Sequence, residues 1–531
     1  MKLYKNKLIT SALVLALGAG FLCSCGGNGK NGANGNLDLA GYPIKTDKTL
    51  TYWIDLPTNV SSVFTNLGET EFAKELEKRT GVKIEYVHPS IGQGSEAFSL
   101  MIASGDMTDM IKSDWSKALG GPSITMADNV IVNLDDLIEK YAPGLKGYLD
   151  ENPDLARRVR TDDGHYYVFP FVRGDEKLYI SSGPVIRHDW LESVGMQIPE
   201  TIDEMEAVLR AFKDILGVEA PLTMLKTNTP QLINICQSST TFYVEDGKVK
   251  FGPLEDDYKS ALVRLSTWFN DGLLDKNYVS TDSTLLDSNM LNGISGVTYA
   301  SGGSGVGKWL ETMESKGESF DIVGIPYLST AKGTAPRFDF SENAYAPHGS
   351  VAITSVCKSP ELAAKFLDYG YTEEGRAFFN FGTEGVSYTM VDGYPTYTDE
   401  IMKNPDGLTV TQAMGKYFMA SNNGPFIQDK RYIEQYYSRA QQKESLVNWT
   451  KFVADTSSSK LPSLTYTTEE NTEYANIIAD VDKFVAENTA QYISGIKSLD
   501  SYDKFIADMK SLKIERAIEI VQAAYDRYLS R

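Results

Sequence analysis

The stretch Glu71–His88, EFAKELEKRTGVKIEYVH, predicts a helix followed directly by a strand. Phe72 and Leu76 lie on one face of the expected helix, and Gly81 follows it as glycine commonly does at helix C-termini. Val82–His88 then alternates apolar and polar side chains, which is the period of a strand with one buried face. The chain therefore passes from helix to strand across a single glycine.

The flanking segments extend this pattern. Thr49–Leu56 predicts a strand before the helix, Ser95–Ser104 a second helix, and Asp109–Lys112 a short third strand. This βαβαβ order predicts a parallel sheet with helices on its faces. Ligands of such sheets bind beyond the carboxyl ends of the strands, so Asp114 and Trp115, directly after the third strand, are candidate ligand-binding residues. The alternative for Trp115 is a surface side chain that covers a helix.

Further along the chain, Thr201 and Glu204 have the spacing of a capping box. They open an expected helix with an apolar stripe. The last region, 471–528, is expected to be mostly helical. We also expect strands at 165–170, 296–301, 321–326 and 350–355, and helices at 134–141, 258–270, 306–315 and 360–370.

The N-terminus has the layout of an export signal. A basic start is followed by the apolar run Leu8–Leu22, which is shorter than the roughly 20 residues that a membrane-spanning helix needs. Leu22, Ser24 and Cys25 resemble the end of a bacterial lipoprotein signal, in which the cysteine sulfur receives the lipid. We expect residues 1–24 to be a signal peptide and Cys25 to be the lipidation site, carrying acyl chains such as palmitate. An ordinary cleaved signal with an incidental cysteine is the alternative.

Length, composition and net charge limit the number of domains and the kinds of partner. A chain of 531 residues is too long for one core and suggests two domains or lobes. The glycine- and asparagine-rich region within 25–45 predicts a flexible tether. The net charge of −20 disfavours nucleic acid and anionic lipid as partners. It also disfavours a polyanionic ligand, although a local basic pocket could override it.

Two cysteines, Cys236 and Cys357, lie beyond the signal region. They could pair outside the cytoplasm, but a single possible bridge across a long stretch of chain is not a disulfide framework. We therefore expect buried free thiols rather than a disulfide.

Taken in order, the motifs resemble the extracellular solute-binding lipoproteins, family 1, of carbohydrate ABC importers. The resemblance is strongest to the long members, which include oligosaccharide and alginate binders, and it runs from Thr49 to Arg531. Its main segments are FAKELEKRTG (72–81), LDDLIEKYAP (134–143), IRHDWLESVG (186–195), PETIDE (199–204), DGLL (271–274), GTEGVSY (382–388) and QAAYDRY (522–528).

This resemblance implies an α/β, two-lobe, periplasmic-binding-protein-like (type II) fold with a hinge, a central cleft and extra C-terminal helices. Lobe 1 would comprise 46–180 and 350–395, and lobe 2 would comprise 181–349 and 396–531. Closure about the hinge would bury the ligand. The implied function is to capture an oligosaccharide at the extracellular face of the cell membrane and deliver it to the permease subunits of an ABC transporter. We expect a lipid-anchored monomer with no nucleic-acid partner.

One departure from the family concerns calcium. Long members often carry a calcium loop at the position of Lys213–Pro221, but this segment lacks the closely spaced oxygen ligands that calcium needs. We expect no calcium there, no other metal site and no cofactor.

Sugar recognition needs flat apolar surfaces for the sugar faces and planar polar groups for the hydroxyls. Tyr299 and Trp309 flank the glycine loop Gly302–Gly307, and core packing is the rival interpretation for both. Asp189 and Trp190 fit the start and packing of a helix better than they fit a cleft. The candidate ligand-binding residues are Asp114, Trp115, Arg187, Tyr299, Trp309, Tyr345, His348, Glu384 and Tyr388.

Enzyme motifs are missing from the sequence. It contains no Gly-x-Ser-x-Gly elbow and no His-Glu-x-x-His helix, and its four histidines have no metal-ligand spacing. We expect no catalytic residues. The alternatives are a secreted carbohydrate-active enzyme, hydrolase or lyase, and a surface glycan sensor or adhesin. Release of reducing ends from oligosaccharides would identify the enzyme.

Overall fold

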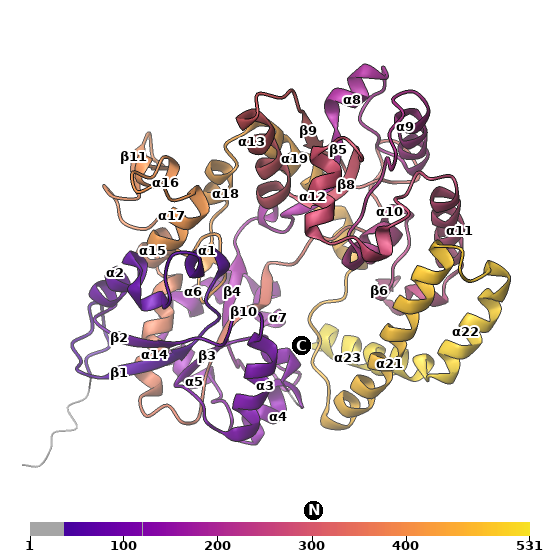
Figure 1. Cartoon of the computed structure of the whole chain (residues 1–531). Coiled ribbons are helices and arrows are strands. Elements are labelled where there is room, and N and C mark those ends of the chain that lie inside the picture. The colour runs from indigo at the N-terminus through magenta and orange to yellow at the C-terminus, as the bar shows by residue number, and fades with distance from the viewer. Residues whose placement is uncertain (1–36, 119) are drawn as a thin grey trace, which may run out of the picture. The chain divides into compact units, whose positions relative to one another are not determined.

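The computed structural model describes residues 37–118 and 120–531 (Figure 1). The chain divides into two units, Met1–Leu37 and Asp38–Arg531, and the fold described here is that of the second unit. The predicted signal peptide, the lipidation site Cys25 and most of the predicted tether lie outside the described residues. Of the helices in the described part of the chain, none has the length and apolar character needed to cross a membrane.

A six-stranded sheet organises the first part of the fold. Its strand order is β13-β4-β10-β3-β1-β2, and β1 pairs in parallel with both β2 and β3, which confirms the predicted parallel βαβαβ unit. The later strand β10 inserts antiparallel between β3 and β4. The strands are β1 (Thr49–Trp53), β2 (Lys83–Val87), β3 (Met110–Lys112), β4 (Phe169–Arg173), β10 (Tyr345–Ile353) and β13 (Ile427–Gln428).

Local signals explain the predicted helices beside this sheet. In α2 (Glu71–Thr80), the Thr70 hydroxyl accepts from the Ala73 N–H at 3.1 Å. Gly81 ends α2 with φ +73°, and a Cβ there would lie 2.1 Å from the Ile44 carbonyl oxygen, so only glycine fits. The helix α3 (Gly94–Ser104) ends in the same way at Gly105.

A three-stranded antiparallel sheet organises the second part. Its order is β8-β5-β9, from β5 (Ser182–Arg187), β8 (Val297–Ser301) and β9 (Ile322–Gly324). The predicted capping box of Thr201 and Glu204 is present at the start of α9 (Ile202–Asp214). Trp449 packs so tightly on this sheet that a Cβ at Gly183 would lie 2.4 Å from its ring. Helices α11 (Asp256–Asn270), α13 (Lys308–Ser315) and α19 (Ala440–Thr450) contribute to the same core.

Some predicted boundaries were wrong. The strand expected at 165–170 is β4, at Phe169–Arg173, and the strand expected at 350–355 is β10, at Tyr345–Ile353. The helix expected from Val306 begins at Lys308 because the glycine-rich segment Gly302–Gly307 forms a π-helical turn. In each case a side-chain pattern locates an element better than it locates its ends.

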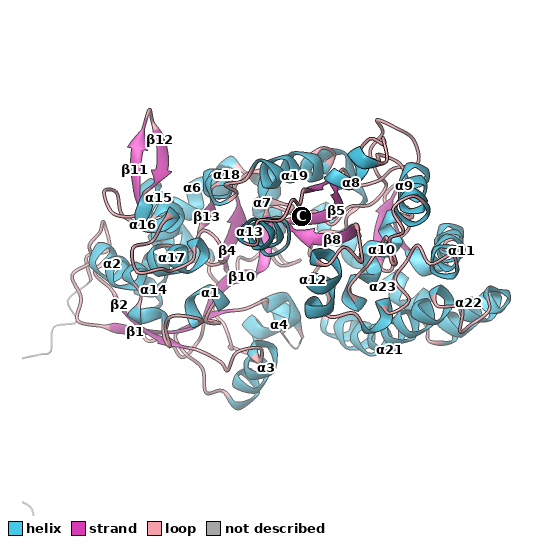
Figure 2. Cartoon of the chain, turned by 45° about the horizontal axis from the view of Figure 1, so that its top comes forward, coloured by secondary structure: helices cyan, strands magenta, loops and turns pink. Residues whose placement is uncertain are grey.

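The remaining elements are mostly helices, and the hairpin β11–β12 stands out from those around it (Figure 2). They are α1 (Thr58–Ser61), α4 (Gly121–Ala127), α5 (Asp135–Tyr141), α6 (Pro143–Glu151), α7 (Pro153–Arg158), α8 (His188–Ser193), α10 (Thr229–Ile235), α12 (Ser283–Leu291), α14 (Pro360–Asp368), α15 (Glu373–Phe381), α16 (Asp399–Met402), α17 (Val410–Tyr417), α18 (Lys430–Tyr436) and α20 (Val453–Thr456), with the hairpins β6 (Phe242–Glu245)–β7 (Lys248–Phe251) and β11 (Tyr388–Val391)–β12 (Tyr394–Tyr397).

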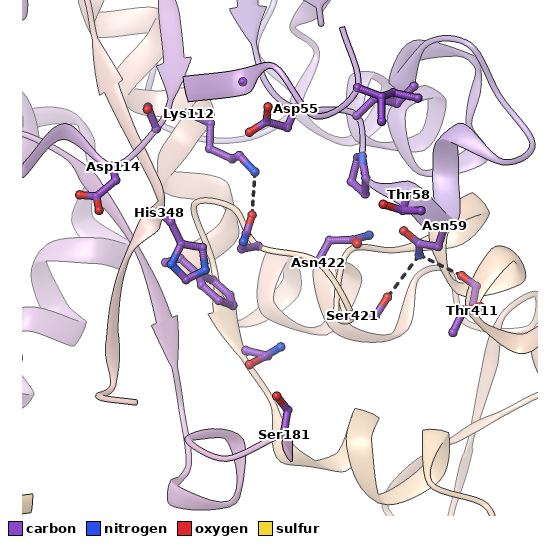
Figure 3. A pocket seen from close by; sticks show the side chains of 18 of the residues that line it. Asp55, Thr58, Asn59, Lys112, Asp114, Ser181, His348, Thr411, Ser421 and Asn422 are labelled. Carbon is purple, nitrogen blue, oxygen red and sulfur yellow. Dashed lines mark hydrogen bonds between the residues drawn. The ribbon is translucent and has the colours of Figure 1, made fainter. Parts of the chain in front are cut away.

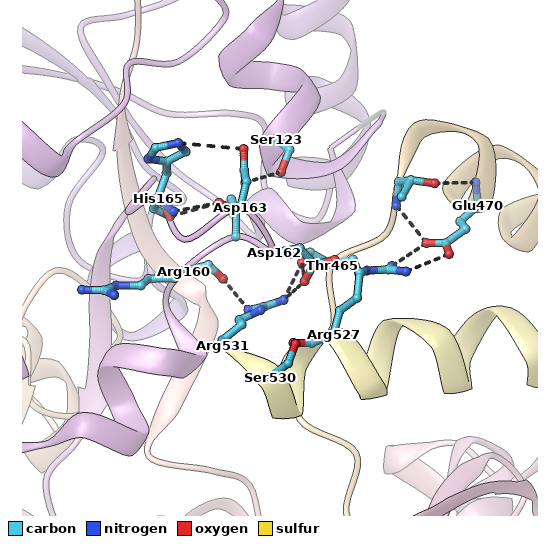
Figure 4. A network of polar contacts seen from close by, with 12 residues as sticks. Ser123, Arg160, Asp162, Asp163, His165, Thr465, Glu470, Arg527, Ser530 and Arg531 are labelled. Atoms are coloured by element: carbon cyan, nitrogen blue, oxygen red, sulfur yellow. Dashed lines mark hydrogen bonds and ion pairs between the residues drawn. The ribbon is translucent and has the colours of Figure 1, made fainter.

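The C-terminal region is helical, as predicted: α21 (Thr468–Ile493), α22 (Tyr502–Ser511) and α23 (Ile514–Ser530) pack against one another. A polar network ties them to the turn before β4 (Figure 4). The Asp162 carboxylate accepts from Thr465 Oγ1 at 2.6 Å, from Arg527 Nε at 2.8 Å and from the Arg531 guanidinium. Arg531, whose side chain is 5% exposed, also donates to the Arg160 carbonyl oxygen at 2.6 Å.

Cys236 and Cys357 are both free, which confirms the expectation of thiols rather than a disulfide. Burial raises the pKa of each thiol to about 12, so both stay protonated and poorly nucleophilic at neutral pH.

Candidate ligand-binding site

A cavity of about 1040 Å³ lies at the carboxyl ends of β1 and β3 (Figure 3). One side is lined by the segments after these strands and by the start of α3, and the other by 178–181, by 301–304 and by residues of α18. The loop 421–423 completes the lining. The cavity is therefore bounded by segments from both sheets, and it is at the upper end of the roughly 300–1000 Å³ usual for ligand pockets.

Lys112, the last residue of β3, reaches into the cavity. The residue is 5% exposed, and Nζ donates to Asn423 Oδ1 at 2.7 Å. Burial lowers the pKa of Lys112 to about 8, while the charge of Asp55 acts in the opposite direction. The ammonium group is thus held in a poorly solvated position (Figure 3).

Two further basic groups line the same cavity. Arg173, at the end of β4, pairs with Glu342 and donates to the Asn343 carbonyl oxygen at 3.2 Å. Burial lowers the pKa of Arg173 to about 10. The pKa of His348 is lowered by burial and then by the charges of Arg173 and Lys112. Lys112 and Arg173 are therefore the cationic groups in this part of the lining, whereas its lowered pKa leaves His348 mostly neutral at pH 7.

Aromatic rings provide apolar surface. They are Trp53, Phe98, Phe171, Tyr432, Tyr436 and Tyr437. Tyr436 is partly exposed and Tyr437 is buried, with their ring centroids 5.4 Å apart. A Cβ at Gly303 would lie 2.4 Å from the Tyr436 hydroxyl, and one at Gly302 would lie 2.5 Å from Tyr437. The glycine loop therefore permits close packing of the two tyrosines.

Of the nine predicted site residues, Asp114 and His348 line the cavity. Asp114 accepts from the Ser116 N–H at 3.2 Å and pairs with Lys117 at 3.4 Å. Trp115 does not line the cavity. It is 1% exposed, its Nε1 donates to the Ile111 carbonyl oxygen at 3.2 Å, and it packs edge-to-face behind Phe98 with ring centroids 5.1 Å apart.

Four other predicted residues are buried away from the cavity lining. Arg187 forms two hydrogen bonds to Asp189, at 2.8 and 2.6 Å. Tyr299 bonds to the Tyr327 hydroxyl at 2.8 Å, Trp309 Nε1 donates to Asp287 at 2.7 Å, and Tyr345 contacts the Tyr167 hydroxyl at 3.3 Å. The structure places Tyr299 and Trp309 in the core, as the rival interpretation expected.

The last two, Glu384 and Tyr388, also lie outside the lining. Glu384 is exposed, and Tyr388 is buried with its ring centroid 5.8 Å from that of Phe381. Both belong to the motif GTEGVSY (382–388), which is part of the family resemblance, and Tyr388 begins β11.

Sequence reasoning missed most of the lining. Trp53 and Asp55 could have been found, because the strand-end rule that selected Asp114 applies equally to β1. Asn422, Asn423 and Tyr436 had no such signal, because they lie in a region without a strand pattern and reach the cavity only through the tertiary fold.

Among residues 37–118 and 120–531, no group of three or more His, Cys, Asp or Glu side chains is arranged to hold a metal ion. The absence of calcium at Lys213–Pro221 stays a prediction.

Several known proteins resemble this chain in sequence or in fold. The FusA protein of Streptococcus pneumoniae, described as a fructooligosaccharide ABC transporter substrate-binding protein, is 25% identical over 98% of both chains. Lipoprotein LipO of Bacillus subtilis is 25% identical over 77% of this chain and 80% of its own. The crystal structure of the alginate-binding protein AlgQ2 without calcium has 24% identity and a TM-score of 0.72, covering 91% of this chain and 99% of that one.

The similarity to AlgQ2 confirms the expected fold, a two-lobe α/β solute-binding fold with additional C-terminal helices. A family model described as bacterial extracellular solute-binding protein matches residues 65–377, which is more than half of the chain. With fold and sequence in agreement, this chain belongs to the family of bacterial extracellular solute-binding proteins.

Proposed function

We propose that this protein captures an oligosaccharide in the cavity and delivers it unaltered to the permease of an ABC importer. The observation that carries the proposal is the composition of the lining: aromatic rings lie beside amide, hydroxyl and charged side chains. Rings can stack on sugar faces, while the polar groups bond to hydroxyls. FusA and AlgQ2, which are described as binding fructooligosaccharide and alginate, support a carbohydrate ligand.

The two lobes would close on the ligand. The proposed lobe 1 comprises 46–180 and 350–395, and the proposed lobe 2 comprises 181–349 and 396–531. The lining draws on both, with Lys112 and Arg173 from the first and Ser301 and Tyr436 from the second. Closure would bury a bound sugar between them, and a permease could then distinguish the loaded from the empty protein.

The direct test is a thermal-shift screen against a glycan panel, with the protein lacking residues 1–25. A ligand that binds only the folded state stabilises it by RT ln(1 + [L]/Kd), so the shift must saturate with concentration. The glycan must be recovered intact. New reducing ends would instead favour the secreted hydrolase or lyase, and no shift with any glycan would contradict carbohydrate capture.

Tyr436 offers a matched test of the aromatic lining. Tyr436→Ala is expected to weaken glycan binding by about 1–3 kcal/mol, by analogy with aromatic stacking on bases. Isothermal titration calorimetry measures the change. Tyr148, partly exposed on α6 and outside the lining, provides the control Tyr148→Ala, which should bind as the parent protein does. Equal glycan affinity of the parent protein and Tyr436→Ala would show that Tyr436 does not contribute to the site.

The proposed location is the extracellular face of the cell membrane, through a lipid on Cys25. LipO, a relative described as a lipoprotein, supports this. Cys25→Ala is expected to release the protein from the membrane fraction, because no thiol would remain at that position to carry the acyl chains that give stable anchoring. Mass spectrometry of the parent N-terminus and fractionation of cells check this. Retention of Cys25→Ala in the membrane, or a parent N-terminus without lipid, would contradict the anchor.

A further inference from the structure

Basic groups gather in one part of the cavity, although the whole chain has a net charge of −20. Lys112, Arg173 and His348 line this part, and two carboxylates, Asp55 and Asp114, face it. Lys117 also lines the cavity, but it is exposed and pairs with Asp114. Arg173 pairs with Glu342 and Lys117 with Asp114, so these two cations already have a charged partner.

Lys112 differs from these cations in having a neutral hydrogen-bond partner. Its hydrogen-bond acceptor is the neutral amide oxygen of Asn423, at 2.7 Å. Among the residues that the structure describes, no carboxylate lies within ion-pair distance of Nζ, and Asp55 acts on it only from farther away. A buried ammonium without a paired carboxylate is costly, because the hydrogen bond to an amide replaces only part of its hydration.

Asn422 supplies a second, independent feature. Its side-chain Nδ2 is buried and has no hydrogen-bond partner in the described part of the chain, and the residue lines the cavity next to Asn423. Buried donors in folded proteins are nearly always paired. Nδ2 itself is covered in this structure, so an acceptor on the ligand would reach it when the proposed lobes close. Figure 3 shows Lys112, Asn422 and His348 around the same part of the cavity.

We propose that the ligand is an acidic oligosaccharide, with a uronate carboxylate seated beside Lys112 Nζ and Asn422 Nδ2. This inference rests on the proposed function and selects among its ligands. A carboxylate supplies both the missing counter-charge and an acceptor, whereas a neutral hydroxyl supplies only the second. The contact with Lys112 outweighs the negative charge of the whole chain, because a short, poorly solvated contact is strong, whereas exposed charges more than a Debye length away are screened by salt.

The charge state of Lys112 gives the inference a pH signature. Its pKa of about 8 reflects burial, opposed by the charge of Asp55. The other charged or titratable groups of the lining are His348, Arg173, Lys117, Asp114 and three tyrosines, Tyr432, Tyr436 and Tyr437. A carboxylate beside Nζ raises the pKa of Lys112, so binding at pH 8.5 takes up a proton. Affinity is greatest below pH 8 and falls as the pH rises above it, because the free ammonium is then lost.

The test compares oligogalacturonates and oligomannuronates with their carboxyl-reduced, neutral counterparts, using the protein without residues 1–25. Calorimetry should detect uronate binding, with proton uptake at pH 8.5 that is read from buffers of different ionisation enthalpy. Lys112→Met should weaken uronate binding by about 10- to 100-fold, the usual range for a hydrogen bond to a charged group. The control Lys146→Met removes a lysine on α6 outside the lining and should change nothing.

Each outcome of these measurements supports or contradicts the acidic ligand. Equal binding of uronates and their reduced forms, or binding without proton uptake by the unsubstituted protein, overturns the acidic ligand even if Lys112→Met fails to fold. Binding of a neutral oligosaccharide with no binding of either uronate overturns it as well, while the proposed function stands. If neither the uronates nor a wider neutral panel binds, the proposed function fails, and this inference fails with it.

Discussion

Replacing Trp115 with alanine is expected to lower the free energy of unfolding by about 3–5 kcal/mol, as for other buried tryptophans truncated to alanine. The side chain is 1% exposed and packs against Phe98, and its Nε1 bonds to the Ile111 carbonyl oxygen. Truncation leaves a cavity behind Phe98 and removes the hydrogen bond to the Ile111 carbonyl oxygen in β3. Chemical denaturation measures the loss.

The conservative substitution Trp115→Phe keeps a ring against Phe98 and should cost less than Trp115→Ala. Any effect of either variant on glycan affinity should be small once the protein is folded, because Trp115 lies outside the cavity lining. A variant with parental stability and greatly weakened glycan binding would show that Trp115 contacts the ligand and that its burial changes when the ligand binds.

Replacing Asp162 with asparagine is expected to lower the free energy of unfolding by about 3 kcal/mol, since breaking a buried ion pair from one side costs about 3–5 kcal/mol and this pair is slightly exposed. The side chains of Asp162 and Arg531 are 18% and 5% exposed. Without the carboxylate, Arg531 keeps a buried charge whose acceptors are the Arg160 carbonyl and the Thr465 hydroxyl. The C-terminal helices should then detach more easily from the turn before β4 (Figure 4).

A double-mutant cycle separates the pair from its surroundings. Arg531→Met combined with Asp162→Asn should cost less than the sum of the two single changes, because the double variant contains neither partner alone. Asp154→Asn is the matched control, since Asp154 is 84% exposed and pairs with Arg157 on the surface. Additive losses would show that Asp162 and Arg531 do not act together.

Elements with strong local signals were predicted well. Glu71–Thr80 begins at a threonine cap and ends at Gly81, and the capping box of Thr201 and Glu204 lies where the spacing indicated. The parallel pairing of β1 with β2 and β3 followed from the alternation of strands and helices. These features depend on contacts between residues close in sequence, so a single sequence is enough to specify them.

The site was predicted less well. Tyr299, Trp309 and Arg187 have the chemistry of sugar-binding residues, but their partners Tyr327, Asp287 and Asp189 keep them in the interior. Aromatic and basic side chains serve equally in cores and in ligand sites, so residue type alone cannot separate the two uses.

The sequence by itself determined the fold class, the first parallel unit, the helical C-terminus and the position of one cavity wall, at Asp114 after β3. Only the tertiary structure decided which side chains meet there. It brought Asn422 and Tyr436, more than 300 residues away along the chain, to the end of the strand that carries Lys112. The physical reason is that secondary structure follows from neighbouring residues, whereas a cavity forms where distant segments pack together and leave space between them.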